Sequence, residues 1–156
     1  MVADALVERW GLGRGRDRYR GRLAEGRVRA GDPGAAGDPG GGTAAVRGPR
    51  VAVLCPQTFM NDVGRSVGPA RGAFKLPLER VLVVHDEIDL PFGDVRTRLG
   101  GADFMRVRVG VGRPDSTDPE IVSAYVLGRF REDDAQVRDL VELACEHVER
   151  VVQEGS

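Results

Sequence analysis

Three carboxylates and a histidine lie within the segment His85-Asp86-Glu87-Ile88-Asp89, which directly follows the apolar run Val81–Val84. The apolar run is typical of a buried strand, and α/β proteins usually place their chemistry at the mouth of such a strand. Asp86, one residue beyond the predicted strand, could hold the N–H of a catalytic imidazole and stabilise the cation that forms. The alternative is a loop carboxylate that caps backbone amides, because Asp is common at such turns.

The neighbours of Asp86 are secondary candidates. We expect Glu87 and Asp89 to be solvated or to cap backbone amides. A metal site built from His85, Glu87 and Asp89 is a further alternative, but no second cluster of His or Cys lies nearby in the sequence.

Neither of the two histidines in the sequence is a convincing general base. His85 is adjacent to Asp86, so in an extended strand the two side chains point to opposite faces and cannot form a dyad. His147 flanks the apolar face of the predicted terminal helix, and we expect it to be a boundary residue with a raised pKa.

Phe59 and Asn61 occupy a turn that follows a second predicted strand, residues 50–55. If that strand neighbours the Val81 strand, the two turns share a crevice in which Asn61 offers an amide and Phe59 a stacking face. The alternative is that Asn61 caps the start of a helix and Phe59 packs in the core.

Arginines at positions 96, 98, 106 and 108 form the main local cationic cluster of the sequence. Alternation within a strand places Arg96 with Arg98 on one face, and Arg106 with Arg108 likewise. If the two strands pair, four guanidinium groups gather beside the Asp86 loop, and such a cluster suits a phosphate. The alternative is the polar face of a half-exposed hairpin, which would ordinarily include acids, and no acid occurs within the predicted strands 95–99 and 105–111.

Hydrophobic spacing indicates the elements that must position these groups. The predicted helices are residues 2–10, a stretch after Asn61 that runs to about Phe74, 118–128 and 134–153. The predicted strands are 22–29 (short and exposed), 50–55, 81–84, 95–99 and 105–111. We therefore expect an α/β fold with helices packed on a mixed, twisted sheet. One domain should cover residues 1–156, with a flexible Gly/Pro-rich loop at about 31–49.

Composition restricts the class of protein. The formal net charge is −1, so a nucleic-acid partner is not indicated by bulk charge and would need a local patch. No apolar run approaches the roughly 18 residues of a membrane span, and no charged-then-apolar leader precedes a cleavage site. Cys55 and Cys145 lie far apart in apolar segments, and we expect them to be reduced core residues of a cytosolic protein.

Four motifs follow one another along the chain: PQTFMN (56–61), HDEIDLPFG (85–93), RTRLGG (96–101) and RVRVGVGRP (106–114). In this order they resemble bacterial peptidyl-tRNA hydrolase. Residues 2–11 resemble the first helix of that family, and Tyr125-Val126-Leu127 with the terminal helix resembles its C-terminal part. The resemblance covers most of the chain outside residues 12–49.

The resemblance implies an enzyme that cleaves the ester between a stalled peptide and tRNA without a metal or other cofactor. In that family a His acts as general base on water and an Asp orients it, and Asp86 matches the Asp. Phe59 and Asn61 match the substrate-binding asparagine and its neighbour. The residues that match the clamp on the tRNA 5′-phosphate are Arg96, Arg98 and Arg108. We expect a cytoplasmic monomer whose partner is peptidyl-tRNA, with no membrane association.

The chain also departs from the family pattern. In the family a Gly-rich first strand, an asparagine and the catalytic His precede the first helix, whereas this sequence starts at Met1 within the matching helix. A Gly-His-Asn-Gly loop and a helix follow RTRLGG in the family, whereas Ala102-Asp103-Phe104 follows here. No residue takes the place of the general base, so we expect a truncated, internally deleted member with impaired catalysis and marginal stability.

Three alternatives accompany this interpretation. In the first, Met1 is a misassigned start and the missing strand and His lie upstream. In the second, the chain is a non-catalytic RNA-binding homologue that keeps the arginine clamp. In the third, it is a decayed gene product without function.

Overall fold

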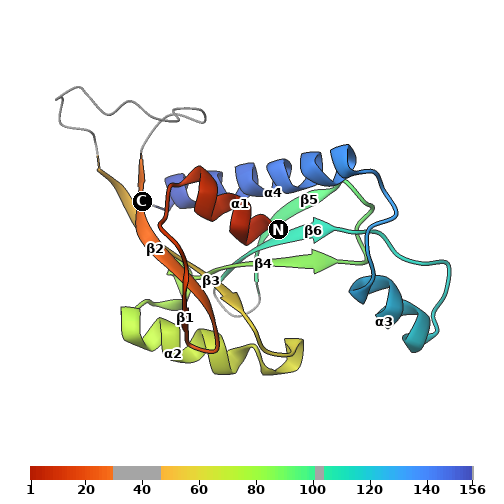
Figure 1. Cartoon of the computed structure of the whole chain (residues 1–156), viewed down its shortest axis with the longest axis horizontal. Coiled ribbons are helices and arrows are strands. Elements are labelled where there is room, and N and C mark those ends of the chain that lie inside the picture. The colour runs from red at the N-terminus through yellow and green to blue at the C-terminus, as the bar shows by residue number, and fades with distance from the viewer. Residues whose placement is uncertain (30–46, 101–103, 156) are drawn as a thin grey trace. The chain divides into compact units, whose positions relative to one another are not determined.

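A computed structural model of the chain describes residues 1–29, 47–100 and 104–155. The helices are α1 (Val2–Arg9), α2 (Gly64–Phe74), α3 (Pro119–Leu127) and α4 (Asp134–Glu154), with 3-10 turns η1 (Met60–Asp62) and η2 (Leu78–Arg80). The strands are β1 (Arg16–Arg18), β2 (Gly21–Arg29), β3 (Arg47–Pro56), β4 (Leu82–Glu87), β5 (Val95–Leu99) and β6 (Met105–Gly110) (Figure 1). These elements confirm the α/β class.

The chain divides into two compact units. Unit 1 comprises Met1, Ala3–Leu76 and Val152–Ser156, and unit 2 comprises Val2 and Pro77–Val151. Each unit contains one three-stranded sheet. The single domain expected over residues 1–156 stays a prediction. The loop expected at about 31–49 lies outside the described residues, except for 47–49, which belong to β3.

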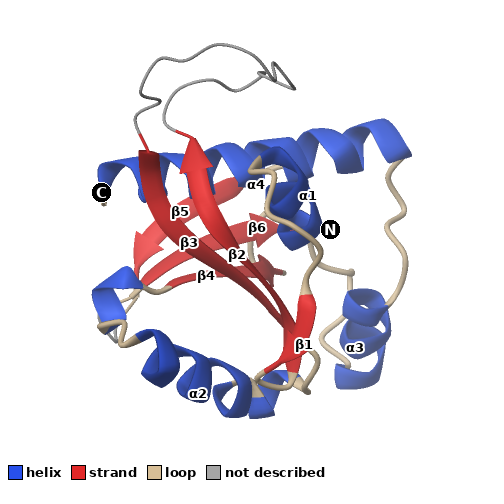
Figure 2. Cartoon of the chain, turned by 60° about the vertical axis from the view of Figure 1, so that its left-hand side comes forward, coloured by secondary structure: helices blue, strands red, loops and turns tan. Residues whose placement is uncertain are grey.

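The sheet of unit 1 is antiparallel and has the order β1-β2-β3 (Figure 2). Strand β2 lies in the middle, and Leu23 and Ala24 are only 2% and 5% exposed. The expectation of a short exposed strand at 22–29 is therefore wrong, because β2 pairs with a strand on each side and buries residues between its charged ones.

Helix α2 of unit 1 ends where the sequence indicated. Lys75 adopts the left-handed conformation with φ of 52°, and the N–H of Leu76 donates to the carbonyl of Arg71 at 3.0 Å. Pro77 follows and cannot continue the helical hydrogen bonding, so the predicted end at about Phe74 is confirmed.

The sheet of unit 2 is mixed, as predicted. Strand β6 lies in the middle, parallel to β4 and antiparallel to β5. Because β4 is at the edge of this sheet, its apolar run is half-buried rather than buried. The strand also continues to Glu87, so the placement of Asp86 beyond the strand end is wrong: the pairing with β6 extends to Glu87 and Gly110.

The connection from β4 to β5 is tight where it meets the sheet. Gly93 has φ of 93° and follows Phe92 in a turn that the N–H of Asp94 closes on the carbonyl of Pro91 at 3.2 Å. The N–H of Gly110 donates to the carbonyl of Asp94 at 2.7 Å. A Cβ at Gly110 would lie 2.1 Å from the carbonyl oxygen of Pro91, so only glycine allows this approach.

Helix α4 covers one face of the β4-β6-β5 sheet (Figure 1). On that face Val107 is fully buried and Val109 is 8% exposed. The helix residues that are buried are Val137, Leu140, Ala144, Cys145 and Val148. Their spacing gives one apolar stripe, as the sequence predicted for 134–153. Cys145 is buried as expected, whereas Cys55 in unit 1 is half-buried.

Strands β5 and β6 form a hairpin. Leu99 pairs with Met105, and the N–H of Gly100 donates to the carbonyl of Phe104 at 2.8 Å. The break that the family resemblance predicts after Gly101 falls on residues 101–103, which lie outside the described residues. The described strands on either side of these residues pair in continuous register.

No helix within the described parts of the chain combines the length and the apolar character needed to cross a bilayer.

The close approach at Gly110 generates a test of the fold. We expect Gly110→Ala to lower the free energy of unfolding by about 1–3 kcal/mol, because the added methyl group forces the Pro91 turn away from β6. Gly68→Ala is the matched control: it lies inside α2, where an added Cβ meets nothing within 4 Å, and it should be neutral or stabilising by roughly 0.5–1 kcal/mol. Urea denaturation followed by circular dichroism measures both, and equal stability of the two variants would contradict the packing described.

Candidate functional site

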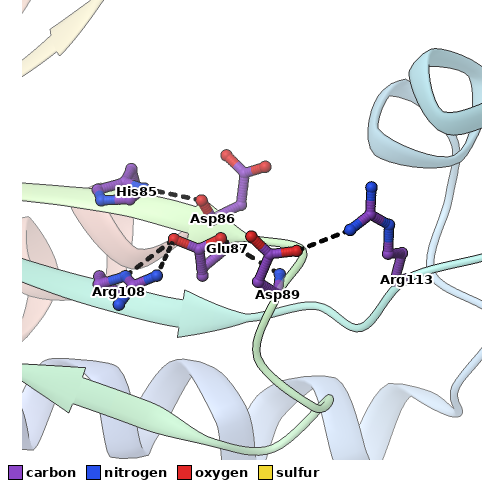
Figure 3. A network of polar contacts seen from close by, with 6 residues as sticks. All are labelled: His85, Asp86, Glu87, Asp89, Arg108 and Arg113. Atoms are coloured by element: carbon purple, nitrogen blue, oxygen red, sulfur yellow. Dashed lines mark hydrogen bonds and ion pairs between the residues drawn. The ribbon is translucent and has the colours of Figure 1, made fainter. Parts of the chain in front are cut away.

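The polar groups at the end of β4 divide between the two faces of the sheet. His85 and Glu87 share one face, and Asp86 between them belongs to the other. Figure 3 shows the carboxylate of Asp86 pointing away from Glu87 and Arg108. The sequence prediction that His85 and Asp86 diverge is thereby confirmed.

The carboxylate of Asp86 is exposed and has no hydrogen-bond partner or ion-pair partner among the described residues. The imidazole of His85 turns back instead, and its Nδ1 lies 2.8 Å from the backbone carbonyl oxygen of Asp86 (Figure 3). A carbonyl oxygen only accepts, so Nδ1 carries the proton. The role of Asp86 as an orienting carboxylate stays a prediction. The imidazole of His85 contacts the backbone of Asp86 and not its carboxylate, so His85 is not the histidine that this role requires.

His147 is held at the other edge of the sheet. Its Nδ1 lies 2.9 Å from the Oγ1 of Thr97 on β5. Burial lowers the pKa of His147, Arg150 lowers it further, and Glu146 opposes them, so the raised pKa expected from the acidic helix is wrong. Thr97 and Asp86 lie on strands two places apart, roughly 10 Å across the sheet, so this contact does not bring the ring of His147 to Asp86.

The four arginines of β5 and β6 gather on one face, as the sequence predicted. In the antiparallel register Arg96 pairs with Arg108, and Arg98 pairs with Arg106. Directly opposed residues of two strands share a face, and like charges placed there repel one another. We call these four residues the arginine face. It is the face opposite the one that carries Val107 and Val109.

Two members of the arginine face are paired with carboxylates. The Nε and Nη2 of Arg108 donate to the Oε2 of Glu87 at 2.8 and 2.6 Å, with the two side chains 25% and 15% exposed (Figure 3). Arg96 contacts Asp94 at 3.2 Å, and both of those side chains are about half exposed. The acids that the sequence seemed to lack therefore come from β4 and from the turn before β5.

Glu87 has a larger role than the capping residue that was expected. Its Oε1 does accept the backbone N–H of Asp89 at 3.2 Å, but its other oxygen binds Arg108. The hydrogen bonds from Arg108 are the main cause that lowers the pKa of Glu87, followed by the amide of Asp89. Alternation placed Glu87 on the face of His85, but only the pairing of β4 with β6 brings Arg108 onto that face, opposite His85 and within reach of Glu87. Asp89 is exposed and forms an ion pair with Arg113 at 2.9 Å.

Phe59 and Asn61 belong to unit 1, where they lie at η1. The ring of Phe59 is 83% exposed and Asn61 is exposed as well. No side chain caps this turn, so the alternative of a capping asparagine and a core phenylalanine is wrong. Their role in substrate binding stays a prediction, and their exposure leaves both side chains free for a ligand.

The arrangement of unit 2 can bind an anion. Guanidinium groups present planar N–H donors that match the oxygens of a phosphate. The described residues hold no group of three or more His, Cys, Asp or Glu side chains that could bind a metal ion.

Comparison with known proteins finds matches over the whole chain. The family model described as peptidyl-tRNA hydrolase matches residues 1–103 and 94–156. These two segments overlap over residues 94–103, which include the position after Gly101 where the motif order predicts a break. A peptidyl-tRNA hydrolase of Azorhizobium caulinodans is 33% identical over 161 residues, which cover 93% of this chain and 69% of the relative. The enzyme of Bdellovibrio bacteriovorus is 40% identical over 123 residues, covering 66% of this chain and 65% of the relative.

Solved structures are similar in fold. A crystal structure of a peptidyl-tRNA hydrolase in complex with N-propanol has a TM-score of 0.73 and 25% identity, covering 97% of this chain and 76% of that one. The peptidyl-tRNA hydrolase of Acinetobacter baumannii has a TM-score of 0.67 and 23% identity, covering 97% of this chain and 81% of that one. The second likeness concerns the fold alone.

The ion pair of Glu87 and Arg108 generates a prediction about acid stability. A lowered folded-state pKa means that the pair stabilises the fold above the ordinary Glu value of about 4.3, and that this contribution is lost as the pH falls through the lower folded value. We expect Glu87→Gln to be less stable at pH 7 by about 1.5–3 kcal/mol and to lack this part of the acid dependence.

Urea denaturation at several values between pH 3 and pH 7 measures this effect. Glu79→Gln is the control. Glu79 is exposed in the same unit, and its substitution removes the same charge as Glu87→Gln. A Glu87→Gln profile that parallels that of the wild type would refute the stabilising role of the pair.

Proposed function

Because the chain belongs to the peptidyl-tRNA hydrolase family, we propose that it binds peptidyl-tRNA through the arginine face and that its hydrolysis of the peptidyl ester is impaired. The observation that carries this proposal is the strand register, which pairs Arg96 with Arg108 and Arg98 with Arg106 on one face. We also propose that the protein is a monomer and acts in the cytoplasm, where translation forms peptidyl-tRNA.

Binding to the tRNA backbone is supported by the charge balance of this face. Four guanidinium groups are opposed by two carboxylates, Glu87 and Asp94, and no further carboxylate partner occurs among the described residues. The remaining positive charge is local, on a chain whose formal net charge is −1. A phosphate backbone is the nucleic-acid component that such a surface attracts without reading sequence.

Impaired hydrolysis is supported by the positions of both histidines. The sequence contains two, and the structure places the ring of His85 on a backbone carbonyl and that of His147 on Thr97. Neither ring has a contact with the carboxylate of Asp86 in the described part of the chain. Loss of a positioned general base typically lowers a rate by about 10²–10⁴-fold.

The substrate end of the complex is proposed to contact Phe59 and Asn61. The exposed ring of Phe59 can stack against a base or an apolar side chain, and the exposed amide of Asn61 can donate and accept hydrogen bonds. This assignment follows the residue-by-residue match of the PQTFMN motif.

One experiment tests both halves of the proposal. We expect fluorescence anisotropy to detect tRNA binding at low salt, with an affinity that falls steeply between 50 and 200 mM salt, because bound phosphates release counterions. Arg98→Ala should weaken binding and reduce the salt slope by about one. Arg138→Ala is the matched control, since it removes an exposed arginine from α4, which lies on the other face.

The same preparations are then assayed for cleavage of an N-acetylated aminoacyl-tRNA. We expect no turnover above the uncatalysed rate. Turnover that disappears in Asp86→Ala would overturn the claim of impaired hydrolysis, and absence of tRNA binding at low salt would overturn the claim of binding.

A further inference from the structure

We infer that the tip of the β1–β2 hairpin in unit 1 is a second surface for the phosphate backbone of tRNA (Figure 2). Arg18, Tyr19 and Arg20 form this hairpin tip. The inference rests on the proposed function and extends it, because the arginine face belongs to unit 2 and none of the four sequence motifs includes the hairpin.

The hairpin is strongly basic. Residues 14–22 contain five arginines and one acid, Asp17, in a chain whose formal net charge is −1. Alternation places Asp17 on the other face of the hairpin from Arg18, because Asp17 pairs with Arg22 whereas Arg18 pairs with Gly21. The acid of the hairpin therefore does not offset the charge of the tip.

Two arginines elsewhere in the hairpin are already neutralised. Arg16 forms an ion pair with Glu25, and Arg22 forms one with Asp4 of α1. These pairs occupy the arginines along the strands and leave the two arginines of the hairpin tip for a ligand.

Arg18 and Arg20 are exposed and have no carboxylate partner in residues 1–29, 47–100 and 104–155. Gly21 and Arg29 are the two ends of β2, roughly 26 Å apart at about 3.3 Å per residue. The hairpin tip is thus at the end of the strand remote from the interruption in the described chain.

The backbone of the tip is strained. Tyr19 and Arg20 are the two residues between β1 and β2, and their φ angles are 55° and 53°. Positive φ at both positions is the condition for a type I′ turn, which favours asparagine and glycine, and other residues are strained in this region. Strain of this kind clusters at ligand-binding sites. The turn alone would be better formed with glycine in place of Arg20, so the fold gives no reason for a long charged side chain there.

Three contacts hold the hairpin tip in place without neutralising it. The N–H of Gln57 donates to the carbonyl of Arg20 at 2.9 Å. The ring of Tyr19 packs edge-on against that of Phe74, with the ring centres 6.3 Å apart. The Cζ of Arg18 lies 4.9 Å from the centre of the Tyr19 ring, which is a cation–π contact. Such a contact orders the guanidinium and preserves its charge.

Arginines positioned in this way suit a phosphate backbone. The planar N–H donors of a guanidinium group match phosphate oxygens, and less conformational entropy is lost on binding when the side chain is already ordered. Because tRNA carries a phosphate at every nucleotide, one molecule can contact more than one basic surface of the chain.

The first test measures tRNA binding by fluorescence anisotropy between 50 and 200 mM salt. We expect Arg18→Gln and Arg20→Gln each to raise the Kd by roughly threefold or more at the lower salt concentration. Each should also reduce the salt slope by about one, because each removes one phosphate contact. Arg138→Gln is the control for loss of one exposed arginine and should change the Kd by less than about twofold.

A variant that removes the strain separates binding from folding. We expect Arg20→Gly to raise the midpoint of thermal unfolding, because glycine adopts positive φ without strain, and yet to weaken tRNA binding as much as Arg20→Gln does. A lower midpoint with unchanged affinity would make Arg20 a purely structural residue and overturn the inference.

The variants also distinguish this inference from the proposed function. Binding that Arg98→Ala weakens, and that both tip variants leave unchanged, would overturn the role of the hairpin tip and keep that of the arginine face. Binding that responds to the tip variants alone would keep the hairpin tip and refute the arginine face. Absence of tRNA binding at low salt would overturn both.

The second test uses the unmodified chain, so it does not depend on a variant that folds. Phenylglyoxal modifies accessible arginines, and mass spectrometry locates the modified positions. We expect tRNA at low salt to protect Arg18 and Arg20 while Arg138 stays reactive. Equal modification of the hairpin tip with and without tRNA would overturn the inference. Protection by poly-glutamate but not by tRNA would also overturn it and assign the tip to an acidic protein.

Discussion

Repulsion between arginines is the constraint around which unit 2 is organised. The hairpin of β5 and β6 places four guanidinium groups in adjacent positions on one face, a placement that is unfavourable unless negative charge is brought to it. Part of that charge comes from within the fold, because parallel pairing of β4 with β6 delivers Glu87 to Arg108. The ion pair therefore fixes the end of β4, and with it the position from which Asp86 projects. Arg98 and Arg106, the other two members of the arginine face, have no carboxylate partner in the described part of the chain.

The two faces of the β4-β6-β5 sheet differ in character, one apolar and covered by α4, the other carrying the arginines. On one face α4 packs over Val107 and Val109, and Thr97 and His147 form a hydrogen bond there. Burial lowers the pKa of His147, which favours the neutral form of the ring in that environment. The arginines alternate with these apolar residues, so a one-residue shift in register would bury the guanidinium groups and expose the valines. Because burying charged groups is costly, the observed register is strongly favoured over one shifted by a residue.

Much of this arrangement could be predicted from the sequence, because it depends on local patterns. The strand Val95–Leu99, the terminal helix and the gathering of the arginines all follow from hydrophobic spacing and alternation. The partner of Glu87 could not be predicted, because it depends on which strands pair and in which register. The pKa of His147 was predicted to shift in the wrong direction for a similar reason. The sequence shows the acids along α4 but not the burial of the ring, which is the main cause of the shift.

Strands β5 and β6 are neighbours in the sequence, and the hydrogen bond between Gly100 and Phe104 lies close to their connection. Pairings between adjacent strands close a short loop and form at low entropic cost, whereas the β4–β6 pairing must span the whole hairpin. We therefore expect the arginines to come into register before Glu87 reaches Arg108 during folding. Dissolved anions screen that early repulsion, more so as ionic strength rises. Negative charge near the arginine face therefore favours formation of the hairpin as well as the finished sheet.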